Sequence, residues 1–261
     1  PDATRDARSS LVGSEMCIRD SLNLPARRRP GRLNLRGLIP LLLLFTGGCA
    51  LLPQPEVLEP AHTDPPTALS APVTAKTYRI TDANLVIHTY RAGWLSKLAH
   101  NHVMETTRIG GAIHLAEPLE DSTAHLYFRP WDLVLDDPDS RAAAGAGFES
   151  ERSAEDIAAT RTRMLGPKGF HSNDHTWVMV AVSWQDRTVA ALEINFREGT
   201  YAFNAPLTWS IEEDVLAASA DLEISHRALG IRPYSAFAGA IAVAQPIRIQ
   251  LKLSARPASS L

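Results

Sequence analysis

The chain has few cysteines, no apolar run long enough to span a bilayer and no excess of basic charge beyond its first residues. Only Cys17 and Cys49 occur among 261 residues. Nothing after Cys49 can form a disulfide, so a fold in that part must be held by its hydrophobic core. The missing cysteine pairs also remove the commonest ligands of a structural zinc site.

The balance of charge changes along the chain. Residues 49–261 hold 18 basic and 25 acidic side chains, a net charge of −7. Proteins that bind nucleic acids present a basic face to the phosphates, and this charge argues against such a partner. It also provides no polybasic attraction to anionic lipid across this part as a whole.

Residues 1–21 do not read as part of a fold. The stretch SLVGSEMCIRDS shows no apolar periodicity and looks like translated adapter sequence from the assembly of an open reading frame. We therefore predict that residues 1–21 are an artefact and that Cys17 has no biological role.

Residues 22–48 have the features of an export signal. A cluster of arginines precedes the apolar stretch GLIPLLLLFTGG at residues 37–48, which is of signal-peptide length. Small residues Gly47 and Gly48 lead into Cys49, a pattern that resembles a bacterial lipoprotein cleavage site. This resemblance implies a lipid on Cys49 and, with Ala50 after it, delivery to the periplasmic side of the outer membrane in a Gram-negative bacterium.

Residues 49–75 contain six prolines between Pro53 and Pro72. Proline fixes φ and removes a backbone donor, so we predict a semi-extended tether between the lipidated cysteine and a folded domain.

Residues 76–257 have the texture of a β-protein. Ile247, Ile249, Leu251 and Leu253 alternate with polar residues, as expected for a strand with one buried face. Short connections such as QDR and REG suit antiparallel neighbours. We predict an all-β fold, a sandwich or closed barrel of about eight strands. The predicted strands lie near residues 77–91, 109–117, 124–135, 176–184, 188–196, 200–211, 215–224 and 240–254.

One segment predicts a helix between strands. Ser153 can cap it, with Asp156 three residues later, and Gly166 and Pro167 end it. Ile157, Met164 and Leu165 can share one face, so this helix could cover one end of a barrel.

Several segments resemble one known family. The stretch from Leu222 to Ala255, with GIRPYS at its centre, and the earlier YRAG and AHNH segments are similar to the YceI-like domain family, which is periplasmic and bacterial. The resemblance covers roughly residues 77–255. It implies an extended antiparallel lipocalin-like barrel with an apolar tunnel that holds a polyisoprenoid or another long amphiphilic lipid.

Such a tunnel needs inward-facing apolar side chains, since each buried CH₂ contributes about 0.8 kcal/mol. Residues within the alternating strands are the candidates, and Arg232 and Tyr234 in the closing loop could meet a polar headgroup. The candidates for the tunnel wall are Ile87, Leu126, Phe128, Trp177, Phe196 and Phe203.

The segment KLAHNHVM places His100 and His102 two residues apart, on one face if it is a strand. Three interpretations remain open: a hydrogen-bonded pair at the barrel rim, contact with a ligand headgroup, or a metal site. The sequence has no HExxH motif, and we predict no bound metal.

Two other patterns suggest chemistry only weakly. The acidic run Asp136–Asp139 lacks the glycine and the later glutamate of a calcium loop, and a capped turn near Arg141 explains it better. Ser225 and Ser235 stand outside any GxSxG motif. We therefore expect no enzyme activity and no cofactor.

The sequence thus favours a membrane-anchored periplasmic protein that binds an isoprenoid or fatty-acyl lipid. The alternatives are a metal- or redox-linked protein that uses the rim histidines, and a scaffold whose barrel is filled by its own side chains. The oligomeric state is not fixed by the sequence, and a homodimer is one option.

Overall fold

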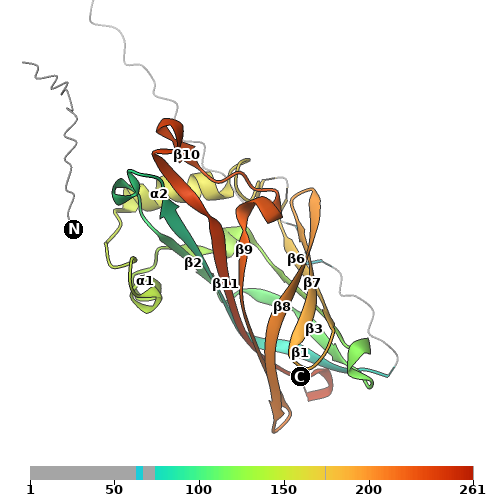
Figure 1. Cartoon of the computed structure of the whole chain (residues 1–261). Helices are drawn as coiled ribbons and strands as arrows, with labels where there is room; N and C mark the ends of the chain where they lie inside the picture. Colours follow the sequence, from blue (N-terminus) through green and yellow to red (C-terminus); the bar gives the residue numbers. More distant parts are fainter. Residues whose placement is uncertain (1–62, 67–73, 174, 261) are drawn as a thin grey trace, which may run out of the picture. The chain divides into compact units, whose positions relative to one another are not determined.

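The computed structural model describes residues 63–66, 74–173 and 175–260. The chain from Val57 onward forms one compact unit, and its described part is a closed barrel with short helices (Figure 1). The predicted artefact, the predicted signal sequence with Cys49, and most of the proline-rich segment lie outside the described residues.

Eight antiparallel strands close the barrel in the order β1-β3-β4-β6-β7-β8-β9-β11, with β11 paired back to β1. Three shorter strands, β2, β5 and β10, extend the sheet at one end. The strands are β1 (Lys76–Ala92), β2 (His102–Thr106), β3 (Ile109–Leu115), β4 (Thr123–Phe128), β5 (Val134–Leu135), β6 (Val178–Trp184), β7 (Val189–Phe196), β8 (Gly199–Glu212), β9 (Val215–Ser225), β10 (Ser235–Ala236) and β11 (Ile241–Pro257).

The predicted alternation of β11 is confirmed. Ile247, Ile249, Leu251 and Leu253 all face the barrel interior, where they line a cavity, and β11 pairs with β1 along most of its length. The apolar face of β11 is buried against the inside of the closed sheet. The all-β prediction with about eight strands therefore holds.

The sequence did not predict β2 as a strand of its own. It pairs with the second half of β1, while β3 pairs with the first half. The register continues across the break, since Thr106 faces Leu85 and Ala112, six residues on, faces Arg79, six residues back. β2 and β3 thus pair with β1 as one strand that is interrupted between them. β5 pairs with the other edge of β2.

The prediction of one helix between strands needs a correction, because two α-helices, α1 (Pro138–Ala144) and α2 (Ala154–Leu165), occur there. α2 is the predicted helix, with Ser153 accepting a hydrogen bond from the Asp156 N–H. α1 falls on the acidic run read as a capped turn. Asp137 does cap it, accepting from the N–H groups of Asp139 and Ser140, but Pro138 at the first position lets the chain continue as a helix.

Short 3-10 helices complete the connections. They are η1 (Ser96–Leu98), η2 (Leu119–Asp121), η3 (Pro130–Asp132), η4 (His226–Leu229), η5 (Phe237–Gly239) and η6 (Ala258–Ser260). None of the helices in the described ranges is long and apolar enough to cross a membrane.

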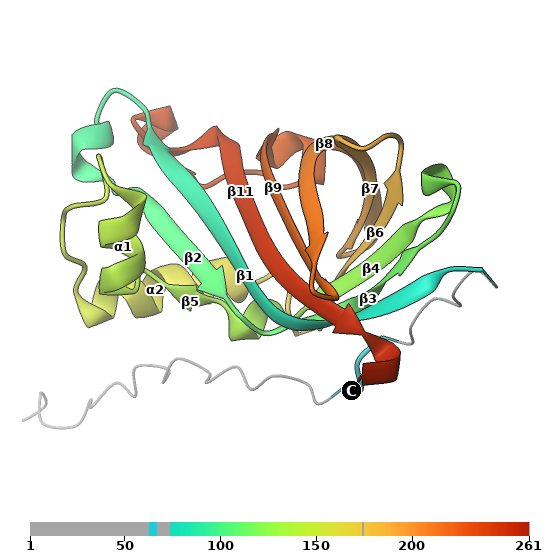
Figure 2. The same ribbon diagram turned by 90° about the horizontal axis from the view of Figure 1, so that it is seen from below.

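Two hydrophobic clusters lie in the barrel. One lies where the chain enters β1 and leaves β11; we call this region the closed end, and its buried residues include Tyr78, Ile113, Trp184, Leu216 and Ala255. The other lies toward α2 and includes Ile87, Met104, Phe128, Leu135 and Phe196. Figure 2 shows α1 and α2 near the end of the barrel opposite the C-terminus.

Candidate functional site

The interior of the barrel holds a cavity of about 1350 Å³. Aliphatic side chains from most strands form its wall, and it reaches from α2 to the closed end. Its apolar wall includes Leu85, Ile87, Ile109, Ile113, Leu126, Val180, Val182, Leu192, Ile194, Leu207, Leu222, Ile247, Ile249, Leu251 and Leu253.

The cavity exists because many inward positions carry small residues. Ala124, Ala190 and Ala205 are buried and line it near the closed end, and Ala218 and Ala220 line it from β9. An eight-stranded barrel is just wide enough for its side chains to fill it or for one slender ligand to occupy it. Alanine at these layers leaves the space for a ligand.

Among the described lining residues, the charged side chains all lie at the other end. We call this region the mouth; it comprises the cavity-lining parts of residues 98–102, 156–170, 197 and 226–235. Its ionisable residues are His100, His102, Asp156, Arg163, Lys168, Arg197, His226, Arg232 and Tyr234. Leu98 and Tyr234 are 66% and 50% exposed while also lining the cavity, so the cavity reaches the surface here.

α2 is fixed across the mouth by one arginine. Arg161 donates to the carbonyl oxygens of Leu133 and Trp131, at 2.5 and 2.6 Å. Burial lowers the pKa of Arg161 from its usual value, with Asp132 acting in the opposite direction. Among the described residues, β5 is an edge strand of the sheet. The bonds from Arg161 satisfy two carbonyl groups just before β5. They also hold α2 as part of the cavity wall.

Cations outnumber carboxylates at the mouth. Its described lining residues include four cations, Arg163, Lys168, Arg197 and Arg232. They include one carboxylate, that of Asp156. The Arg163 guanidinium lies over the Tyr234 ring, 5.3 Å from its centroid. The arrangement can attract an anionic group to the mouth while the interior accepts an apolar chain.

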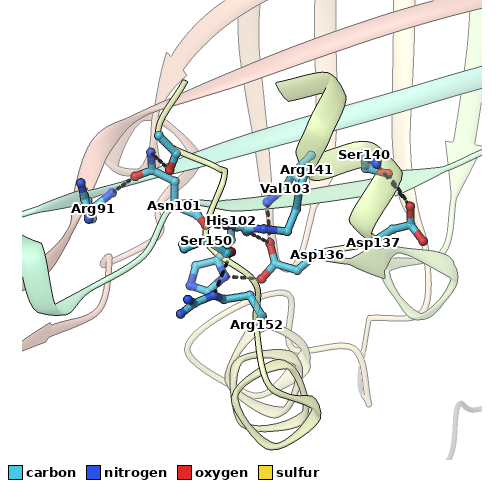
Figure 3. Close-up of polar contacts among 11 residues, drawn as sticks. Arg91, Asn101, His102, Val103, Asp136, Asp137, Ser140, Arg141, Ser150 and Arg152 are labelled. Carbon is cyan, nitrogen blue, oxygen red and sulfur yellow. Dashed lines mark hydrogen bonds and ion pairs between the residues drawn. The ribbon is translucent and has the colours of Figure 1, made fainter. Parts of the chain in front are cut away.

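His102 belongs to a buried ionic network beside the mouth (Figure 3). Its Nδ1 lies 2.6 Å from Asp136 Oδ2, while Arg141 donates to Asp136 Oδ1 at 2.6 Å and the Val103 N–H donates to the same oxygen at 3.1 Å. The Asp136 side chain is fully buried. Arg141 also donates to the Asn101 carbonyl, so the network ties α1 to β2.

The pKa values around the mouth follow from burial and from these contacts. Burial alone would raise the pKa of Asp136, but hydrogen bonds from His102, Val103 and Arg141 hold it below its usual value. Burial lowers the pKa of His100, with Arg152 adding to the effect. Burial also lowers the pKa of His226, against the backbone acceptors at Gln245 and Ala244. His100 and His226 therefore favour the neutral form.

The structure places four of the six tunnel candidates on the cavity wall: Ile87, Leu126, Phe128 and Phe196. Trp177 lies elsewhere, because Val178, Val180 and Val182 point inward and strand alternation turns the residues between them outward. Its indole N–H donates to Thr63, and its ring packs edge-on against Tyr127.

Phe203 is also absent from the cavity wall, although it shares a face of β8 with Ala205 and Leu207. It is half-buried and packs against the cluster near α2. The four headgroup candidates, His100, His102, Arg232 and Tyr234, all line the mouth. For His102, the rim interpretation, in which a ring nitrogen meets a carboxylate, describes the contact with Asp136.

Sequence reasoning missed Arg163, Lys168 and Arg197 as mouth residues, along with the alanines that hollow the barrel. Each cation looks like an ordinary surface residue in its own segment, and only closure of the barrel brings them together. Among the described residues, no group of three or more His, Cys, Asp or Glu side chains could hold a metal ion.

Comparisons with known proteins give matches among solved structures but none to a family model or a curated protein. The crystal structure of Burkholderia cenocepacia BcnA matches with a TM-score of 0.45 and 8% sequence identity, over 66% of this chain and 95% of that chain.

Proposed function

We propose that this chain is a non-catalytic lipid-binding protein that holds a long-chain amphiphile, such as an isoprenoid, in its barrel. The observation that carries the proposal is the cavity of about 1350 Å³ with an apolar wall and charged residues confined to one end. This volume exceeds the range of about 300–1,000 Å³ that is typical of small-molecule pockets, which favours a long ligand.

The energetics support a ligand with few polar contacts. Each methylene that leaves water for the cavity contributes about 0.8 kcal/mol. A polar or anionic headgroup would stay at the mouth among Arg163, Lys168 and Arg232, and the tail would extend toward Trp184 and Ala190. The resemblance of residues 222–255 to the YceI-like family supports the same class of ligand.

The place of action belongs to the proposal as well. The lipoprotein-like pattern at Cys49 supports a protein anchored to the outer membrane and facing the periplasm. The tether predicted for residues 49–75 would give the barrel reach from that anchor.

Binding of a fluorescent polyene fatty acid to residues 57–261, which form one compact unit, tests the proposal. We expect saturable binding with enhanced fluorescence and competition by long isoprenoid alcohols that strengthens with chain length. The matched variants are Ala205→Leu, which narrows the cavity, and Ala202→Leu, which faces outward on the same strand. Absence of saturable binding, or equal binding by the two variants, would contradict the proposal.

A further inference from the structure

Large apolar side chains are exposed together on two loops beside the mouth. Trp94 and Leu98, in the loop between β1 and β2, are 81% and 66% exposed, and Phe237 in η5 is 77% exposed. Trp94 and Phe237 are the two most exposed large hydrophobic residues in the described part of the chain. We call Trp94, Leu98 and Phe237 the apolar tip.

The two loops form one surface. The Leu95 N–H donates to the Ala240 carbonyl at 2.8 Å, and a Cβ at Gly93 would clash with the same carbonyl. Both loops lie at the end of the barrel that carries α2 (Figures 1 and 2). The apolar tip is therefore a continuous feature of the fold.

The backbone at Phe237 is held in an unfavourable conformation. Phe237 and Ala238 have φ angles of 50° and 53°, in the left-handed region that L-residues with a side chain seldom adopt. The Phe237 ring stays 77% exposed, so burial within the chain does not offset this strain. Strain combined with exposure of an aromatic ring is typical of a functional contact surface.

The charge around the tip differs from the charge of the chain. Residues 90–104 contain Arg91 and Lys97 and no acidic residue, and residues 224–247 contain Arg227 and Arg232 and no acidic residue. This local excess of cations contrasts with the net charge of −3 for the chain. Tryptophan, phenylalanine and leucine flanked by basic residues suit the headgroup layer of an anionic bilayer, where aromatic rings partition and cations meet phosphates.

We infer that the apolar tip docks onto an anionic phospholipid surface and inserts Trp94, Leu98 and Phe237 among the headgroups. Leu98 also lines the cavity, so the docked tip sets the mouth against the bilayer. A lipid could then pass between membrane and cavity without crossing water. Docking itself does not require that the cavity be occupied, so it can be tested apart from the proposed function.

Vesicle flotation with residues 57–261 tests this inference. The probes are vesicles of phosphatidylethanolamine with phosphatidylglycerol, and vesicles of phosphatidylcholine alone. We expect binding to the anionic vesicles, and a loss of about tenfold or more in the double variant W94S/F237S, since two large apolar side chains no longer leave water. Replacing Lys97 and Arg232 with glutamine should weaken binding to anionic vesicles only, by about fivefold for each charge.

The control is Ile211→Ser, which removes an exposed apolar side chain from β8 at the closed end and should leave binding unchanged. Melting curves check that all variants fold. Failure of the wild-type protein to float, or flotation of W94S/F237S equal to wild type, would overturn the inference. A wild-type dimer that this double variant converts to monomers, with no flotation by either, would also overturn it and assign the tip to a second copy.

The cavity ligand is followed separately by fluorescence binding in the same variants. W94S/F237S should bind the polyene fatty acid as the wild type does. Loss of vesicle binding with intact ligand binding therefore isolates docking from the proposed function.

Discussion

The two ends of the barrel differ in burial and in charge, although the same sheet runs through both. At the closed end, paired strands bury Tyr78, Leu216 and Ala255 almost completely, and none of the described residues that line the cavity there is charged. At the mouth, the wall is completed by α2 and loops, and it contains cations and a buried ionic network. The comparison teaches that regular strand pairing forms the apolar part of the cavity wall, while α2 and the loops place charged side chains at its other end.

The largest effect should come from breaking the ionic network beside the mouth. Asp136→Ala leaves Arg141, which is 5% exposed, without its carboxylate. Removing one partner of a buried pair costs about 3–5 kcal/mol. We expect the free energy of unfolding, measured by urea denaturation, to fall by about this amount.

The matched control is the exposed pair Asp221–Arg248, whose side chains are about half exposed. Asp221→Ala should cost under about 1 kcal/mol, as is usual for surface ion pairs. Equal costs for the two substitutions would show that the network contributes no more than a surface contact.

Filling the closed end should shorten the cavity without changing the mouth. Ala205→Leu adds about three methylene equivalents to a buried wall position, and should weaken binding of long chains by about 2 kcal/mol, or roughly thirtyfold. Shorter chains that do not reach Ala205 should bind as before. A series of fatty acids of increasing length measures this, and a uniform loss at every length would contradict the predicted orientation of the tail.

Acid should weaken the fold in two steps. His88, His100, His125 and His226 have pKa values lowered by burial. The unfolded chain therefore binds more protons once the pH drops below about 6.5, and the free energy of unfolding falls with it. The lowered pKa of Asp136 stabilises the fold above about pH 4, and this contribution is lost as the pH falls through the folded-state pKa.

Melting curves between about pH 7.5 and pH 5 measure the first step. His226→Gln at the mouth and His125→Gln nearer the closed end should each reduce the fall in melting temperature. A melting temperature independent of pH across this window would contradict burial of these imidazoles.

The smallest effect should come from a single cation at the mouth. Arg232→Gln should weaken binding of an anionic amphiphile by under about 1 kcal/mol, because the side chain is exposed. Binding of a neutral alcohol of equal length should not change. Arg256→Gln, exposed near the closed end, is the control, and fluorescence competition is the measurement.

Much of the barrel could be predicted from the sequence, because the alternation of apolar and polar residues within a strand can be recognised locally. Ile247 to Leu253 identified β11 and its buried face. The alternation failed to orient Trp177, since a shift of one residue at the start of β6 reverses the face. The short β2 was not predicted as a strand, because its five residues, with His102 and Glu105 among them, show too little periodicity.

The entrance was less predictable, because it depends on residues far apart in the sequence. His102 and Asp136 are 34 residues apart, and neither segment alone indicates the pairing. Arg232 and Tyr234 could be selected from their loop, but the contact of Tyr234 with Arg163 arises only when α2 packs over the barrel. The cavity itself depends on small residues from several strands that face the same axis.

Native mass spectrometry of residues 57–261, purified from a bacterial periplasm, tests the central claim most directly. The account predicts a co-purifying apolar mass of several hundred daltons, on the scale of a long-chain lipid, that organic solvent releases and that Ala205→Leu reduces. A protein that carries no such mass and gains none when incubated with long-chain isoprenoids would contradict it.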